Sequence, residues 1–176
     1  MKENFLKNEI ASGFVKKWLA NGNYFVLFNP KKEEYFTQPK IVAPYRSKRN
    51  KFAYNAIPWF ASQDVCFILP RDRGVNLKYI LAILNSNLCF QWLRFKGKKK
   101  GELLELMQKP LSDIPIIKVD FNKQTPFINL VDRILSATQC DPGADMSALE
   151  REIDELVYAL YGLTEDEKVL MQAAAN

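Results

Sequence analysis

The chain of 176 residues is long enough for one domain with a hydrophobic core, with or without a helical appendage. It contains no histidine, which excludes Ser-His-Asp and Cys-His catalysis and His-ligated zinc sites. The net charge of +5 is unevenly distributed: residues 1–118 carry 21 Lys and Arg against 9 Asp and Glu, whereas residues 119–176 carry 4 against 11. The basic first part predicts a polyanionic partner, most simply a nucleic acid.

The first 70 residues are expected to form short strands joined by turns. Their apolar runs are rich in aromatic and β-branched residues and are bounded by turn-forming residues, which is typical of strands. The predicted strands are residues 24–28, 40–43, 52–57, 59–61 and 64–69, and a short helix is expected within residues 1–20. Pro44 limits the second of these strands to an edge of the sheet or ends it.

Residues 75–117 are expected to organise the chain around one helix. Asn76 can cap its start, and apolar residues follow at spacings of three and four from Leu77 to Leu88, which indicates one buried face. Gly97 and Gly101 then enclose three lysines, so a mobile cationic loop is predicted after the helix. Residues 111–117 are expected to be extended.

Three helices are predicted after residue 118. Thr125 can cap the first one, with Pro126 at its first helical position, where proline is favoured. The second helix covers residues 146–161 and ends at Gly162. Thr164 and the glutamate three residues later match a capping box for a last short helix.

These elements predict an α+β fold, in which a mainly antiparallel sheet is packed by a central helix and followed by a helical C-terminal appendage. The expected division places an α+β domain at residues 1–118 and the appendage at residues 119–176. No apolar run approaches the ~20 residues that span a bilayer, and the N-terminus lacks the apolar core of a signal peptide. A cytoplasmic protein without membrane contact is therefore expected, with reduced thiols at its three cysteines.

Several local patterns are similar to catalytic or ligand-binding motifs, but simpler interpretations are favoured. Asn29 and Pro30 are followed by Lys31, so they indicate a turn and not the Asn-Pro-Pro-Tyr type of motif of DNA aminomethyltransferases. Residues 97–101 lack the strand–loop–helix context and the Ser or Thr of a phosphate-binding P-loop. Four carboxylates are expected on the solvated face of a helix, and not around a metal ion: Glu150, Glu152, Asp154 and Glu155.

Two basic clusters are the strongest functional indication. Residues 45–51 lie in a predicted turn between strands and residues 94–100 follow the predicted helix, so both could lie on one side of the same sheet. Arg and Asn can distinguish guanine and adenine through paired hydrogen bonds, whereas Lys mostly contacts phosphate. We therefore expect Arg46, Arg49 and Asn50 to read bases and the lysines of the second cluster to hold phosphates. The full set expected to contact DNA is Tyr45, Arg46, Lys48, Arg49, Asn50, Lys51, Asn55, Arg71, Arg94, Lys96, Lys98, Lys99 and Lys100.

The order of seven stretches carries a resemblance to a known family. They are residues 39–42 (PKIV), 52–55 (FAYN), 64–69 (DVCFIL), 78–86 (KYILAILNS), the glycine-containing basic loop, 110–116 (PLSDIPI) and 152–164 (EIDELVYALYGLT). Together they resemble the TaqI-like C-terminal specificity domain of type IIG restriction–modification enzymes. In such enzymes this domain selects the DNA sequence, while a separate methyltransferase domain binds S-adenosylmethionine and flips the target base.

The resemblance implies a DNA-recognition module without activity of its own. The sequence has neither the glycine loop for S-adenosylmethionine nor the catalytic tetrapeptide, so no cofactor is expected in this chain. The implied partners are double-stranded DNA and the methyltransferase or nuclease domain of a longer bacterial protein. The residues leave one alternative of another class, a protein–protein interaction module whose helical tail docks a partner and whose basic loops aid solubility.

Overall fold

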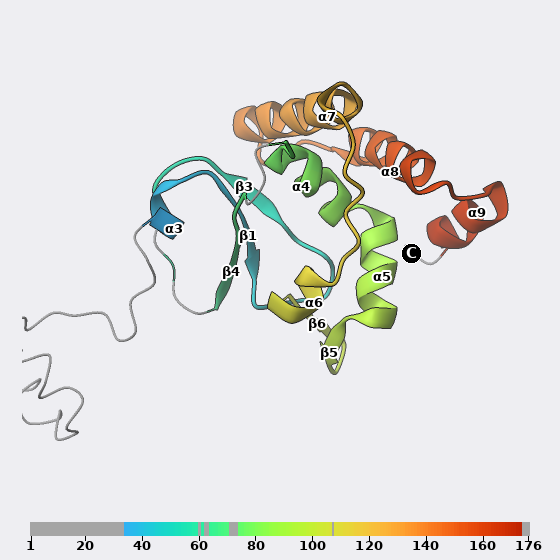
Figure 1. Ribbon diagram of the computed structural model, residues 1–176, viewed down its shortest axis with the longest axis horizontal. Helices are drawn as coiled ribbons and strands as arrows, with labels where there is room; N and C mark the ends of the chain where they lie inside the picture. Colours follow the sequence, from blue (N-terminus) through green and yellow to red (C-terminus); the bar gives the residue numbers. More distant parts are fainter. Residues whose placement is uncertain (1–33, 60, 62–63, 71–73, 107, 174–176) are drawn as a thin grey trace, which may run out of the picture. The chain divides into compact units, whose positions relative to one another are not determined.

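A computed structural model describes residues 34–59, 61, 64–70, 74–106 and 108–173 (Figure 1). The helix predicted within residues 1–20, the strand predicted at residues 24–28 and the candidate Arg71 lie outside the described residues. The chain divides after residue 32, so the fold described below is that of residues 33–176.

The first sheet has three antiparallel strands in the order β3-β1-β4 (Figure 1). They are β1 (Lys40–Pro44), β3 (Ala53–Asn55) and β4 (Val65–Ile68), and the short helix α3 (Glu34–Thr37) precedes them. Ile41 of β1 lies opposite Tyr54 on one side and Ile68 on the other, and its side chain is fully buried. Three predicted strands are thus confirmed. The strand predicted at residues 59–61 is wrong, because Trp59 and Ala61 lie outside any strand.

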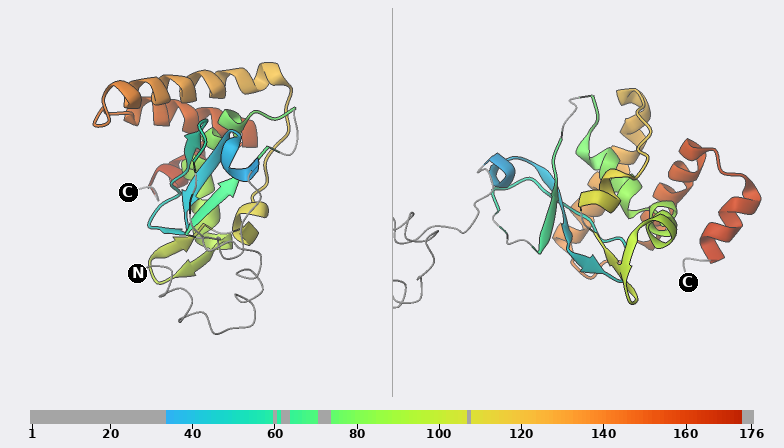
Figure 2. Two further views of the ribbon diagram at one scale, coloured as in Figure 1. Left: turned by 90° about the vertical axis from the view of Figure 1, so that its left-hand side faces the viewer. Right: turned by 60° about the horizontal axis from the view of Figure 1, so that its bottom comes forward.

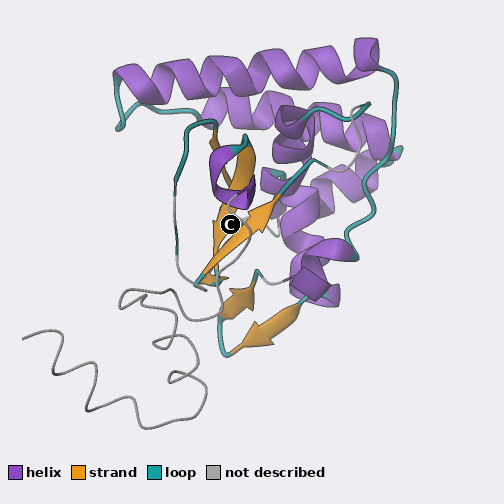
Figure 3. Ribbon diagram, turned by 60° about the vertical axis from the view of Figure 1, so that its left-hand side comes forward, coloured by secondary structure: helices purple, strands orange, loops and turns teal. Residues whose placement is uncertain are grey.

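A second, smaller sheet has the order β2-β6-β5 and is separate from the first (Figure 3). Its strands are β2 (Arg46–Ser47), β5 (Lys98–Lys100) and β6 (Leu103–Glu105). The prediction of a mobile loop for the three lysines is wrong, since they pair with β6 in an antiparallel hairpin. Gly101 forms the turn of this hairpin with a φ of +61°, a conformation that glycine adopts without steric cost.

The predicted central helix consists of two helices, α4 (Leu77–Asn85) and α5 (Asn87–Lys96), separated by Ser86. The predicted start is confirmed, because the Asn76 side chain accepts a hydrogen bond from the Lys78 N–H at 2.8 Å. Ser86 has extended backbone angles, and its side-chain oxygen accepts a hydrogen bond from the Cys89 N–H at 3.2 Å. It therefore ends one helix and caps the next.

The remaining helices are α6 (Gln108–Ser112), α7 (Phe121–Cys140), α8 (Ser147–Tyr161) and α9 (Glu165–Ala173). Helix α7 begins at Phe121, five residues before the predicted first helical residue, so Thr125 is not its cap and Pro126 lies inside the helix on an exposed face. The extended conformation predicted for residues 111–117 is wrong at its start, where α6 ends. Gly162 ends α8 with a φ of +70°, as predicted. Thr164 and Glu167 form the predicted capping box, with backbone-to-side-chain hydrogen bonds of 2.8 and 3.4 Å.

Helix α4 lies at the centre of the hydrophobic core. It contacts β1 and β3 on one side and α7 and α8 on the other, an arrangement visible in Figures 1 and 2. Tyr79 of α4 is fully buried and packs edge to face against Phe127 of α7, with ring centroids 5.2 Å apart. Gln124 of α7 is also fully buried. Its Oε1 atom accepts a hydrogen bond at 2.9 Å from the backbone N–H of Asn76, which lies in the loop before α4.

The α+β class is therefore confirmed. The division at residue 118 stays a prediction; in the structure, α7 and α8 contribute to the same hydrophobic cluster as α4 and α5. Among the described helices, none is long and apolar enough to cross a membrane.

Candidate nucleic-acid interface

Strand β6 brings the two basic clusters of the sequence together. It pairs with β2 on one side and with β5 on the other, so Arg46 and Lys98 both lie opposite Glu105. One residue along, Ser47 and Lys99 both lie opposite Leu104. The first cluster therefore reaches the second through a single intervening strand. The two runs were predicted as loops on one side of the main sheet. Instead, Arg46 and Ser47 of the first run and Lys98–Lys100 of the second form strands of the smaller sheet.

Glu105 binds the cations on both neighbouring strands. Arg46 donates from Nε at 3.3 Å and from Nη2 at 3.2 Å to Oε1 of Glu105, and Lys98 Nζ lies 3.0 Å from Oε2. Hydrogen bonding to Lys98 and, to a smaller degree, to Arg46 lowers the pKa of the Glu105 carboxyl below its ordinary value. The Glu105 side chain is only 5% exposed, whereas Lys98 is 68% exposed. The acidic group thus lies beneath the surface while its cationic partner faces solvent.

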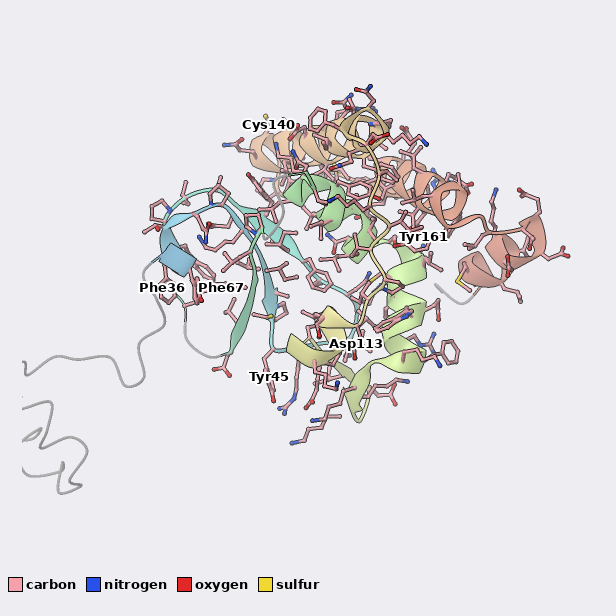
Figure 4. All side chains as sticks on the ribbon, viewed as in Figure 1. Phe36, Tyr45, Phe67, Asp113, Cys140 and Tyr161 are labelled. Carbon is pink, nitrogen blue, oxygen red and sulfur yellow. The ribbon has the colours of Figure 1, made fainter. Side chains whose placement is uncertain are left out.

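Aromatic rings support three of the arginines. The Arg46 guanidinium lies over the Tyr45 ring at 4.6 Å from its centroid, and Tyr45 projects at the same end of the fold as the β5–β6 hairpin (Figure 4). Arg49 and Arg94 both lie over the ring of Phe90 in α5, at 4.7 and 5.7 Å. Such contacts orient a guanidinium without removing its charge from the surface. They also join the turn after β2 to the surface of α5.

We call this region the basic surface. It consists of β2 and the turn that follows it, the last turn of α5, and β5. All of its cationic residues are exposed to solvent: Arg46, Lys48, Arg49, Lys51, Arg94, Lys96, Lys98, Lys99 and Lys100.

Two candidate asparagines lie elsewhere. Asn50 is buried, and its side-chain amide donates to the carbonyl oxygens of Leu84 at 2.7 Å and Ser86 at 2.9 Å, where α4 ends and α5 begins. We therefore do not retain Asn50 as a base-reading residue, since its amide hydrogens stabilise the break between the helices. Asn55 is half-buried in β3 of the first sheet, opposite Lys40, and is not part of the basic surface.

Sequence reasoning missed a buried carboxylate that supports the basic surface. Asp154 was expected on a solvated helix face, but it is only 9% exposed and accepts hydrogen bonds from Asn87 N at 2.7 Å and Asn87 Nδ2 at 2.6 Å. Burial raises the pKa of Asp154 to about 6, despite these hydrogen bonds. The one available signal was its spacing, because Asp154 precedes the buried Tyr158 by one helical turn.

Comparison with known proteins places the chain in a family. It is 28% identical to the type II methyltransferase M.HincII of Haemophilus influenzae over 145 residues, which is 77% of this chain and 28% of that protein. It is 30% identical to the type II methyltransferase M.HindII of the same species over 129 residues, or 68% of this chain and 24% of that protein. The chain therefore spans about a quarter of the length of these relatives. The family model of the TaqI-like C-terminal specificity domain matches residues 6–116, which confirms the expected resemblance. The chain therefore belongs to this family.

Proposed function

We propose that this chain is the DNA-recognition domain of a restriction–modification protein and binds duplex DNA through the basic surface. The observation that carries the proposal is the pairing order β2-β6-β5, which sets two cationic segments about fifty residues apart in the chain on either side of one strand. Cationic side chains gathered on neighbouring elements match the regular charge of a DNA backbone. Membership of a specificity-domain family supports the same conclusion.

Within the basic surface, arginines and lysines have different proposed roles. The lysines of β5 have exposed ammonium groups, which suit phosphate contacts that are independent of sequence. Arg46 and Arg49 lie against aromatic rings and are hydrogen bonded to neighbouring side chains, so their forked guanidinium groups are held in defined orientations. Oriented guanidinium groups suit the recognition of guanine. We therefore assign base reading to these two arginines.

The proposal gives the chain a binding role and no catalytic role. Methyl transfer, with its cofactor S-adenosylmethionine, is assigned to a separate methyltransferase domain of a longer protein, in line with the names of the two relatives. That domain and the duplex are the proposed partners of this chain.

The salt dependence of DNA binding tests the proposal. Binding of the 176-residue chain to fluorescent duplex DNA would be measured by anisotropy at several salt concentrations, for the parent chain and for a Lys98→Ala/Lys99→Ala/Lys100→Ala variant. Each phosphate contact contributes about 0.9 to the slope of log affinity against log salt, so the variant is expected to have a clearly shallower slope.

A second triple variant, Lys123→Ala/Arg133→Ala/Arg151→Ala, is the matched control. It removes the same charge from exposed residues of α7 and α8, outside the basic surface. The proposal predicts a slope close to that of the parent for this control. Equal slopes for both triple variants would overturn the assignment of the basic surface as the DNA-binding face.

A further inference from the structure

A chain of hydrogen bonds connects α8 with the basic surface. Asp154 of α8 accepts from Nδ2 of Asn87, the first residue of α5, at 2.6 Å. The Oδ1 atom of the same Asn87 side chain accepts from Nη2 of Arg49 at 3.0 Å. A residue of the acidic C-terminal part is thus joined to an arginine of the basic surface through one amide group.

The chemistry of Asp154 determines which way this amide points. An ionised carboxylate only accepts hydrogen bonds, so the Asn87 side chain must turn its NH2 group toward Asp154. The amide oxygen then necessarily faces the other way, toward Arg49, which only donates. The backbone N–H of Asn87 also donates to Asp154, at 2.7 Å, which fixes the carboxylate at the start of α5.

Arg49 is consequently held at two points of α5. Its guanidinium donates to Asn87 and lies over the ring of Phe90, three residues further along the same helix. Residues three apart lie on the same face of a helix, so the two contacts hold one side of the guanidinium group. The orientation of the donors of Arg49 thus depends on the polarity of the Asn87 amide.

We propose that Asp154 is a positioning residue for DNA recognition, which orients Arg49 for base contact through the amide of Asn87. This inference rests on the proposed function and extends it, because it makes α8 part of the recognition apparatus. Asp154 has no contact with DNA in this proposal. It acts only by setting the polarity of the Asn87 side chain.

The central test is the Asp154→Asn variant, assayed for binding to a randomised duplex DNA library. Asparagine has nearly the same shape, and its oxygen can still accept from the backbone N–H of Asn87. Its NH2 group, however, faces the NH2 group of Asn87, so the Asn87 amide is expected to flip and present a donor to Arg49. The variant should lose about tenfold in discrimination at the base positions that Arg49→Ala also affects. The double variant Arg49→Ala/Asp154→Asn should lose no more discrimination at these positions than Arg49→Ala alone, because both changes act on one contact.

A polarity swap separates positioning from a merely structural role. In the variant Asn87→Asp/Asp154→Asn, the new amide donates to the new carboxylate, whose second oxygen again accepts from Arg49. The swap is therefore expected to restore the parent sequence preference. Glu150→Gln is the matched control, since it removes the same charge from an exposed residue of α8 and should leave the preference unchanged.

The outcomes distinguish this inference from the proposed function. If Arg49→Ala changes the sequence preference and Asp154→Asn does not, the positioning role is overturned and the DNA-binding role stands. If neither Arg49→Ala nor the alanine triple variant of β5 alters DNA binding, both proposals are overturned. If Asp154→Asn fails to fold, Asn87→Ala removes the same bridge at a partly exposed residue, and no change in preference for it would overturn the inference.

Discussion

Arg46 and Glu105 lie opposite each other across the pairing of β2 with β6, and the arginine donates twice to one carboxylate oxygen, at 3.3 and 3.2 Å. The partners are 59 residues apart in the chain, and the other oxygen of Glu105 contacts Lys98 on β5. Single strands of two or three residues have few backbone hydrogen bonds of their own. The shared carboxylate therefore helps to fix the register of the small sheet and the spacing of its cations.

We expect Glu105→Gln to destabilise the fold at neutral pH. The substitution removes the negative charge between Arg46 and Lys98, so the two cations are left without their ionic partner. Thermal unfolding at pH 7 should show a lower midpoint for this variant than for Glu102→Gln, which changes an exposed glutamate in the turn of the same hairpin. A midpoint equal to that of the control would show that the carboxylate has no role in holding the sheet.

The pH dependence of the same pair gives an independent check. The pKa of Glu105 is lowered in the folded state from its ordinary value of 4.5, so its contribution to stability is fully present above that value. It is lost as the pH falls through the lowered pKa, where the folded state also takes up the proton. The difference in midpoint between the parent and Glu105→Gln should therefore shrink as the pH falls from about 5 toward 3.

Alanine substitutions of the neighbouring residues Arg49 and Asn50 should have opposite effects on stability and on DNA binding. Asn50→Ala removes the donors to two carbonyl groups at the break between α4 and α5, and this should cost about 1–3 kcal/mol in the free energy of unfolding. Arg49→Ala changes an exposed side chain and should cost less than about 0.5 kcal/mol, while it alters DNA binding. Urea unfolding and DNA-binding measurements on both variants check this. A stable Asn50→Ala variant with altered base preference would return Asn50 to the reading residues.

Local patterns predicted the elements whose ends are determined within a few residues. The cap at Asn76, the end of α8 at Gly162 and the capping box at Thr164 depend on hydrogen bonds or backbone angles within one helical turn. The positions of the three strands of the first sheet along the chain followed from runs of apolar residues. These features were visible because each one depends on its own neighbourhood in the sequence.

The features that were missed depend on residues far away in the chain. Two distant residues stabilise the break at Ser86. Asn50 lies 36 residues before Ser86 and donates to its carbonyl oxygen, and Asp154 accepts from the N–H of Asn87, which lies 67 residues before it. Lys98–Lys100 form a strand because Leu103–Glu105 offer a partner, although lysine has a low intrinsic preference for strands. Asp154 is buried because α5 covers it. These contacts join residues far apart in the chain, and the one local signal among them was the spacing of Asp154 from Tyr158.

Lys40 provides a test of the fold away from the basic surface. Its side chain is fully buried, and its ammonium group donates to the carbonyl oxygens of Phe36 at 2.8 Å, Gln38 at 3.2 Å and Ile57 at 3.2 Å. Lys40→Met keeps a long side chain and removes all three donors, so we expect a loss of about 1–3 kcal/mol in urea unfolding. Lys51→Met, at an exposed residue, should change stability by less than about 0.5 kcal/mol. Equal stability of the two variants would contradict the assigned role of Lys40.

The raised pKa of Asp154 predicts a decline in stability with rising pH. Burial is the main cause that takes this pKa from 3.8 to about 6; hydrogen bonds from Asn87 of α5 oppose it, and Glu150 and Glu155 of α8 raise it further. The nearby hydroxyl of Tyr158 has a pKa raised to about 12, first by burial and then by Asp154. Between pH 4 and pH 6, roughly, the folded chain keeps a proton at Asp154 that the unfolded chain has released. The free energy of unfolding therefore falls as the pH rises through this window.

Asp154→Asn removes this titration. The free energy of unfolding of the variant, relative to that of the parent, should therefore increase from about pH 4 to about pH 6 and stay constant above about pH 6. Urea unfolding at a series of pH values measures the difference directly. Asp113→Asn, at an exposed residue before the C-terminal helices, controls for the general effect of removing one carboxylate. A parent chain that gains stability over Asp154→Asn across this window would show that the buried carboxylate is stabilised in its charged form, with the hydrogen bonds from Asn87 outweighing its burial.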